Sequence, residues 1–207
     1  MKRFWCLAIL FVCMFGLLTA ACSCKKQEDE VSLERPVYDT ENISEYVRVG
    51  AYTDCSVALE HADASKGEAI RSLLLAQAEV LQYPEDAVNY YAEQEKQACR
   101  HYAKQNDLSY EDAMEALGLS EEKIQEKSRA MVKEDLVYEY IRADAGIALT
   151  EQEKNSLFDR YAERFSEQYG YELSDVKDSM SELVYEAMLY DKTMEYLIVH
   201  NTFTVAE

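Results

Sequence analysis

Proline and glycine are scarce in this sequence: 207 residues contain two prolines and six glycines. Most of these glycines stand between amphipathic segments, where helices end. A sandwich or barrel of short strands would need many more turn residues. The scarcity therefore favours an all-α fold. No heptad pattern continues without a break, so a long coiled coil is disfavoured.

Histidine and the motifs of catalysis are also rare. The three histidines, His61, His101 and His200, fall in separate predicted segments without the spacing of a metal site. The sequence has neither a glycine-rich phosphate loop nor a G-x-S-x-G turn. We therefore expect no metal, no nucleotide or other cofactor, and no enzymatic activity.

Positive charge is in short supply, because 21 basic residues stand against 40 acidic ones and the formal net charge is −19. Such a surface repels phosphate backbones, so nucleic acid is not an expected partner. High acidity also keeps a protein soluble, which suits a protein that handles aggregating chains.

The first 21 residues predict an export signal. Lys2 and Arg3 precede an uncharged apolar run, and small residues stand before Cys22. The stretch LTAAC resembles the bacterial lipobox, although Thr19 replaces the usual aliphatic residue. The resemblance implies cleavage before Cys22, its diacylation with fatty acids such as palmitate, and a lipid-anchored protein on the extracytoplasmic face of the cell membrane. The alternative is an uncleaved transmembrane anchor, because the run approaches the length of a membrane span.

Three cysteines, Cys24, Cys55 and Cys99, would remain beside the lipidated one. An exported compartment would permit a Cys55–Cys99 disulfide. Unpaired or buried thiols are the alternative, and the sequence leaves both open.

Beyond the leader, the sequence predicts three parts. Residues 22–45 are polar and include Pro36, so they form an acylated flexible tether. Residues 46–61 are a short lead-in, with extended structure favoured over 46–59 by valines and tyrosines, and Gly50 suggests a turn or bulge within it. Residues 62–207 form one helical domain that ends in a β-like tail at 202–205.

Helix boundaries follow from local signals. Pro84 suits a first turn, Ser109 and Ser120 can cap helices, and Thr150 with Glu153 forms a capping box. The first predicted helix runs from about 62 to 80, and the second begins at 84. Further helices run from 109 to 117, where Gly118 follows, from 120 to Gly146 and from 150 to about Gly170. Ser174 caps a short turn, and the last helix extends up to Asn201.

Sixteen tyrosines and seven methionines supply adaptable apolar side chains. Most can be explained as helix-to-helix core, and only an exposed cluster would indicate binding. The candidates for a client-binding surface are Tyr90, Tyr91, Tyr102, Met114 and Met131.

Residues 65–205 resemble the C-terminal chaperone domain of bacterial trigger factor. The resemblance rests on KGEAIRSLLLAQAEVLQYPEDAVNYYAEQEKQACRHYAKQNDLSYEDAM, then KEDLVYEYIRADAGIALTEQE, QYGYELSD and LYDKTMEYLIVHNTFT, in the family's order. It implies a helical body with arms, like that shared with the periplasmic chaperone SurA.

The departures from that family concern its other domains. YVRVGAY, at 46–52, resembles the phrase that precedes an FKBP-type prolyl isomerase in relatives, yet only a few residues separate it from the first helix. The sole tryptophan, Trp5, lies in the leader, and the basic ribosome-docking loop is missing. The resemblance thus implies a chaperone body without an isomerase, which holds unfolded or exported polypeptides without ATP.

Two other functions remain open at this point. The same body could be an adaptor or structural lipoprotein that docks one dedicated membrane or envelope partner. A residual isomerase would need an aromatic proline-binding pocket, which cannot be recognised in the sequence. An extended apolar cradle would favour clients, and one compact patch would favour a fixed partner.

Overall fold

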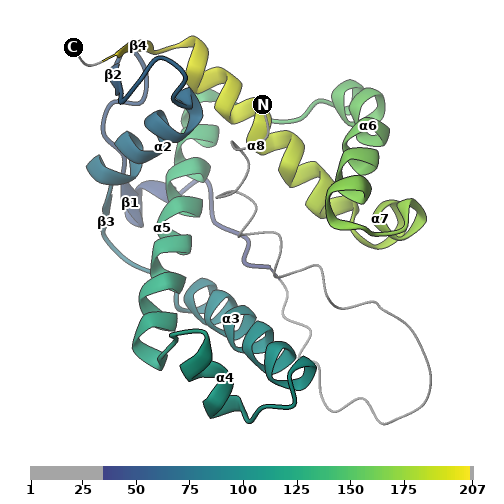
Figure 1. Ribbon diagram of the computed structural model, residues 1–207. Coiled ribbons are helices and arrows are strands. Elements are labelled where there is room, and N and C mark those ends of the chain that lie inside the picture. Colours follow the sequence, from purple (N-terminus) through teal and green to yellow (C-terminus); the bar gives the residue numbers. More distant parts are fainter. Residues whose placement is uncertain (1–34, 206–207) are drawn as a thin grey trace. The chain divides into compact units, whose positions relative to one another are not determined.

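The computed structural model describes residues 35–205 (Figure 1). These residues form seven α-helices, one 3-10 helix and four strands of two to four residues, which confirms the all-α class. The elements are η1 (Ile43–Glu45), β1 (Val47–Arg48), β2 (Ser56–Leu59), α2 (Lys66–Gln77), β3 (Glu79–Val80), α3 (Glu85–Gln105), α4 (Tyr110–Ala116), α5 (Glu121–Ala145), α6 (Glu151–Tyr169), α7 (Leu173–Ser179), α8 (Ser181–Val199) and β4 (Thr202–Val205).

The helix ends obey the local chemistry of the sequence. The Ser109 hydroxyl accepts the amide of Asp112, and Thr150 and Glu153 exchange both bonds of the predicted capping box. Gly170 ends α6 at φ 73°, a left-handed conformation that glycine adopts at low cost. Terminal amides and carbonyls have no partner within the helix, so nearby side chains decide where it begins.

Two predicted boundaries are wrong. The first helix spans Lys66–Gln77 rather than about 62 to 80, because the Ser65 hydroxyl caps it and Ala78 is extended before β3. The turn after Gly170 begins with Glu172 at its N-cap rather than Ser174, and no side chain caps it. An uncapped start leaves no signal in the sequence.

The described chain divides into two compact units. Unit 1 comprises residues 35–47 and 80–136, and unit 2 comprises residues 48–79 and 137–205. The division falls inside β1, β3 and α5.

Unit 1 is built on α3, α4 and the first part of α5. Contacts between α3 and α4 enclose Cys99, Ala103 and Ala113, with Tyr102, Tyr110 and Met114 packed against them. Ion pairs join α3 to α5: Lys96 Nζ lies 2.8 Å from Glu121 Oε2, and Lys127 Nζ lies 2.6 Å from Glu95 Oε1. Glu95 is only 2% exposed, so its carboxylate needs this partner.

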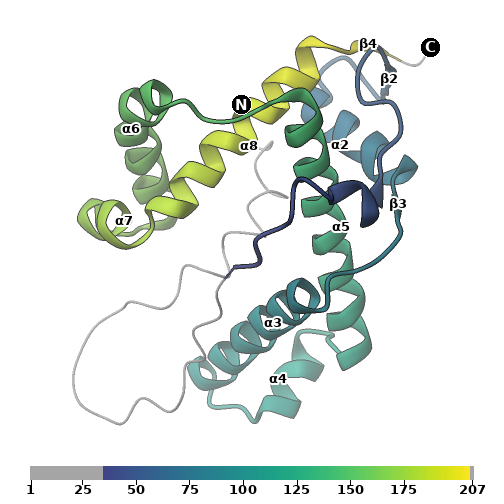
Figure 2. The same cartoon turned by 180° about the vertical axis from the view of Figure 1, so that it is seen from behind.

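Unit 2 packs α6 and α7 against α8, as Figure 2 shows from behind, and α8 also contacts α2. Its buried cation is Arg142 on α5, whose Nε donates to Thr193 Oγ1 on α8 at 3.1 Å. The Nη1 of Arg142 lies 2.8 Å from Glu139 Oε1 and 3.8 Å from Glu186 Oε2. On the surface, Lys192 and Thr150 hold the pKa of Glu153 at about 2 by hydrogen bonding to its carboxylate.

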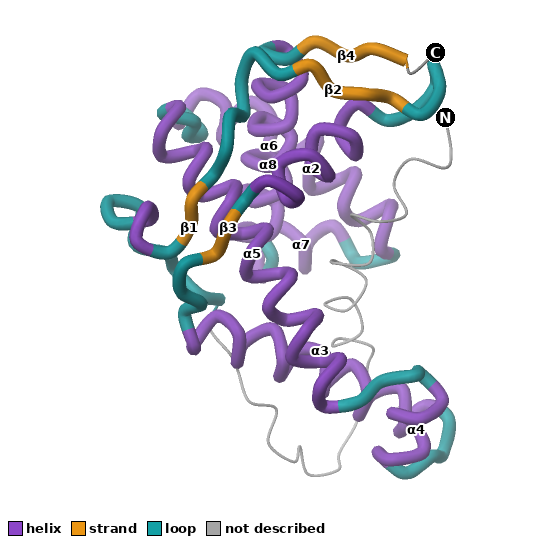
Figure 3. Tube along the Cα trace, turned by 90° about the vertical axis from the view of Figure 1, so that its left-hand side faces the viewer, coloured by secondary structure: helices purple, strands orange, loops and turns teal. Residues whose placement is uncertain are grey.

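The strands form two separate pairs (Figure 3). β1 pairs with β3, and β2 pairs with β4 in parallel, with Ser56 opposite Thr202 and Leu59 opposite Val205. Extended structure is therefore present within 46–59 and at 202–205, as predicted, although the parallel pairing was not. Asn201 supports it, since its side chain accepts the Cys55 amide and donates to the Tyr52 and Leu197 carbonyls.

We expect Arg142→Met to lower the free energy of unfolding by about 1–3 kcal/mol, because it removes a buried donor from Thr193 and a cation from two carboxylates. Urea denaturation followed by circular dichroism measures the change. The matched control is Arg160→Met on exposed α6 surface, for which we expect less than about 0.5 kcal/mol. Equal losses in both variants would contradict a structural role of the Arg142 network.

Candidate functional site

The five predicted client-binding residues lie in unit 1, and the structure separates them into two groups. Tyr90 and Tyr91 are buried side chains of α3, with ring centroids 5.1 Å apart in an edge-to-face arrangement. Tyr102, Met114 and Met131 are half-buried. Only the second group offers surface to a partner.

Tyr91 belongs to a buried polar cluster rather than to a client-binding face, which corrects its predicted placement. Its ring is 2% exposed, and its hydroxyl donates to Asp135 Oδ2 on α5. Tyr38, from the segment before η1, donates to the same oxygen at 3.0 Å. The cluster thus ties that segment and α3 to α5. A buried tyrosine hydroxyl needs a partner, and Asp135 supplies it.

The electrostatics of Asp135 follow from its surroundings. Desolvation raises the pKa of this carboxyl to about 6, against the opposing effects of the Tyr91 and Tyr38 hydrogen bonds and of Arg35. Burial, and then Asp135, raise the pKa of Tyr91, so its hydroxyl stays a proton donor. Glu134 beside Asp135 acts in the same direction as desolvation.

Two of the exposed large apolar residues of unit 1 lie on the hairpin formed by α3, α4 and their connection. Leu108 in the connection is 39% exposed, and Leu117 at the C-cap of α4 is 42% exposed. Tyr102 and Met114 pack half-buried against the Cys99 cluster at the same hairpin. We call the surface of Tyr102, Leu108, Met114 and Leu117 the α3–α4 tip.

Leu108 and Leu117 were missed as candidates by the sequence reasoning. A detectable signal existed, because both leucines stand next to helix boundaries rather than within the buried stripe of a helix. Leu117 also precedes Gly118, whose φ of 64° turns the chain out of α4.

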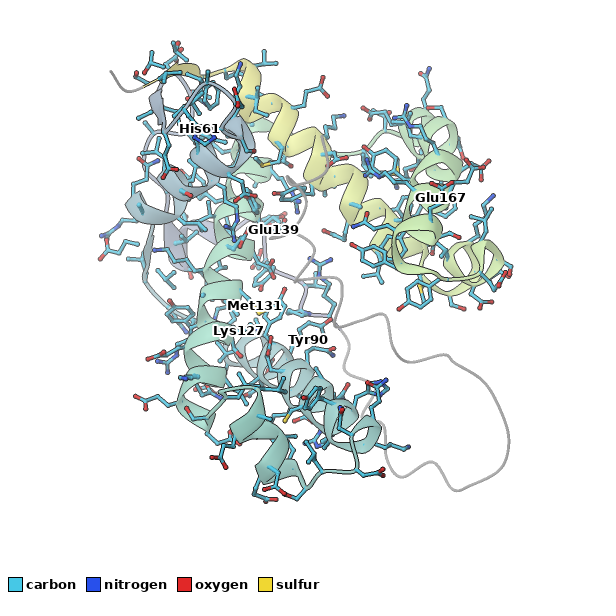
Figure 4. All side chains as sticks on the ribbon, in the orientation of Figure 1. His61, Tyr90, Lys127, Met131, Glu139 and Glu167 are labelled. Carbon is cyan, nitrogen blue, oxygen red and sulfur yellow. The ribbon has the colours of Figure 1, made fainter. Side chains whose placement is uncertain are left out.

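Met131 lies on α5, one turn beyond Lys127, as Figure 4 shows with both residues labelled. Residues four apart share a helix face, so Met131 lies on the side of α5 that carries the cation paired with Glu95. Tyr90, labelled in the same view, comes from α3. Met131 is therefore beside a structural ion pair and outside the α3–α4 tip.

Cys55 and Cys99 are free thiols in the structure, which therefore has unpaired thiols and not a Cys55–Cys99 disulfide. Cys99 is fully buried in unit 1 among alanines of α3 and α4, and burial raises the pKa of its thiol. Cys55 belongs to unit 2, where its Sγ lies 3.2 Å from the carbonyl of Ala51. The two thiols therefore have separate local environments, one in each unit.

Among residues 35–205, no three or more His, Cys, Asp and Glu side chains gather as a metal site. Nor does this part of the chain contain a helix that is long and apolar enough to cross a bilayer. Cys22 and the apolar run before it lie outside the described residues.

Comparison with known proteins identified no relative. No family model, no curated protein and no solved structure matches this chain.

We expect Asp135→Asn to flatten the pH dependence of stability between pH 4 and 6. The folded pKa of about 6 lies above 3.8, the ordinary value of an aspartate carboxyl, so folding favours the protonated acid and the free energy of unfolding of the wild type falls as pH rises through this window. The amide oxygen can accept both tyrosine bonds without a charge. At pH 7.5 the variant gains about 1–3 kcal/mol over the wild type, and at pH 3.5 the difference disappears.

Urea denaturation at pH 3.5, 5 and 7.5 measures this difference. Glu126→Gln, on the exposed surface of the same helix, is the matched control and should run parallel to the wild type at all three pH values. A destabilised Asp135→Asn variant at pH 7.5 would contradict the dominance of desolvation.

Proposed function

We propose that this chain is a membrane-anchored, extracytoplasmic chaperone that holds unfolded or exported polypeptides without ATP and without prolyl isomerase activity. The observation that carries the proposal is the α3–α4 tip, where Leu108 and Leu117 are exposed and Tyr102 and Met114 are half-buried. Leucine, tyrosine and methionine offer apolar area of adaptable shape, which suits clients of many sequences.

The distribution of the exposed apolar side chains also supports holding at several points. Large exposed apolar residues occur in both units: Val37, Leu81, Leu108 and Leu117 in unit 1, and Val199 and Val205 in unit 2. Each site by itself would bind weakly, and an unfolded chain can occupy several at once. Preferential binding of the unfolded state lowers the free concentration of aggregating chain by mass action, so nucleotide is not required.

Charge and anchoring fit the same function. A net charge of −19 limits self-association and favours basic or neutral clients. The anchor would be the lipid on Cys22, since two acyl chains hold a protein stably at a bilayer where one does not.

The alternative is an adaptor that docks one dedicated membrane or envelope partner. It is favoured by the burial of Tyr90 and Tyr91, which leaves the exposed apolar area of the α3–α4 hairpin to one small tip. A compact patch is typical of a fixed interface.

Light scattering of a chemically unfolded client tests the proposal. We expect the full-length chain in lipid nanodiscs to suppress aggregation of several unrelated clients at near-stoichiometric ratios, relative to empty nanodiscs. The double variant Leu108→Ser, Leu117→Ser should require about fivefold more protein for the same suppression, the equivalent of about 1 kcal/mol of lost apolar contact.

The matched control is Lys104→Ser, Glu115→Ser, which changes two exposed residues of the same hairpin without altering apolar surface or net charge. It should behave like the wild type. Failure to suppress aggregation of any client would refute the holding function and leave the adaptor as the explanation.

A further inference from the structure

The parallel pair β2–β4 has an outer edge with unused backbone groups. The Thr202 amide donates to the Cys55 carbonyl at 2.9 Å, so the amide and carbonyl of Thr202 face β2. Because successive residues of a strand point their polar groups to opposite sides, those of Phe203 and Val205 face away from β2. No hydrogen bond among the described residues uses these outward groups.

The apolar side chains of the β2–β4 pair are also only partly covered. Directly paired residues share a face, so Val57 and Leu59 of β2 lie on one face with Phe203 and Val205 of β4. Val57 and Leu59 are buried, whereas Phe203 is half-buried and Val205 is 47% exposed. Lys66 lies over the Phe203 ring, with its Nζ 5.3 Å from the ring centroid, so the exposed part of this apolar face is at Val205.

Nothing in the two strands protects the edge. Natural sheets block exposed edges with charged side chains, proline or bulges. The strands SVAL and TFTV contain no charge and no proline, and their register runs without a bulge. Val199, 71% exposed at the end of α8, adds apolar surface three residues before β4.

We propose that the outer edge of β4 accepts an extended polypeptide segment as a third strand, with apolar side chains at alternate positions beside Phe203 and Val205. The inference rests on the proposed function, for which it names a second client site and its mode of recognition. Strand addition derives affinity from backbone hydrogen bonds, and the flanking apolar positions add selectivity.

An extended chain is the occupant that satisfies both deficits at once. The backbone of an extended chain can pair with the outward amide and carbonyl groups of Phe203 and Val205, and every second side chain of that chain covers the exposed apolar face. A second copy of this chain would bring a second net charge of −19. Like-charge repulsion disfavours that pairing.

Fluorescence anisotropy of a labelled peptide tests the edge directly. The probe alternates threonine and valine, with a lysine at each end, and the protein is the full-length chain in nanodiscs. We expect binding of this peptide and a loss of affinity of about tenfold or more when its alternate amides are N-methylated, because methylation removes backbone donors from one edge.

Two variants test the protein's side of the contact. Val205→Pro removes an outward amide that the fold does not use, and proline is tolerated at such edge positions. We expect it to weaken binding about tenfold or more. Val205→Thr keeps the amide, the shape and the strand preference, so it should weaken binding only about two- to threefold.

The outcomes separate this inference from the proposed function. If the protein suppresses client aggregation but its affinity for the peptide is unchanged by N-methylation and by Val205→Pro, strand addition is overturned and the holding function remains intact. Absence of aggregation suppression would refute the holding function itself. A dimer of the full-length chain in sedimentation that Val205→Pro abolishes would overturn the proposal by assigning the edge to a second copy.

Discussion

The polar contacts of α5 are the constraint on which both units depend. Its first part presents Lys127 to the buried Glu95 and Asp135 to Tyr91 and Tyr38, all within unit 1. Its last turns present Arg142 to Thr193 of α8 within unit 2. Buried polar groups are costly unless paired, so each contact fixes the partner helix at one position along α5. The apolar contacts of α5 are non-directional and would permit a neighbouring helix to shift along it. The polar contacts have specific partners and do not permit such a shift.

The tyrosines show how one residue type is divided between buried and half-buried positions. The hydroxyls of Tyr91 and Tyr38 donate hydrogen bonds to Asp135. Inside unit 2, the rings of Tyr138 and Tyr190 pack edge to face with their centroids 5.6 Å apart. Tyr102 lies instead at the α3–α4 tip. A count of tyrosines therefore predicts a supply of amphipathic side chains, and only the tertiary structure decides which ones keep exposed surface.

Unit 2 and unit 1 present different kinds of apolar surface. The α3–α4 tip offers side chains alone, since the backbone groups within its helices are hydrogen-bonded internally. The edge of β4 offers backbone amides and carbonyls as well as Phe203 and Val205. A chain with both could hold an unfolded segment by its apolar residues and by its backbone, two features that all unfolded polypeptides share. Weak contacts of both kinds permit release without an energy source.

The sequence by itself determined the local features of this protein. The all-α class, the capping box at Thr150 and the stop at Gly170 follow from hydrogen bonds between residues three or four apart, which a reader can trace along the chain. Tertiary structure alone decided the burial of Tyr90 and Tyr91, the free thiols of Cys55 and Cys99, and the exposure of Leu108 and Leu117. It also decided the register of β2 on β4, whose approach depends on Asn201 and Cys55, 146 residues apart. Periodicity states which side of a helix is apolar, but not which neighbour covers that side or where the cover ends, because burial is a property of the assembled chain.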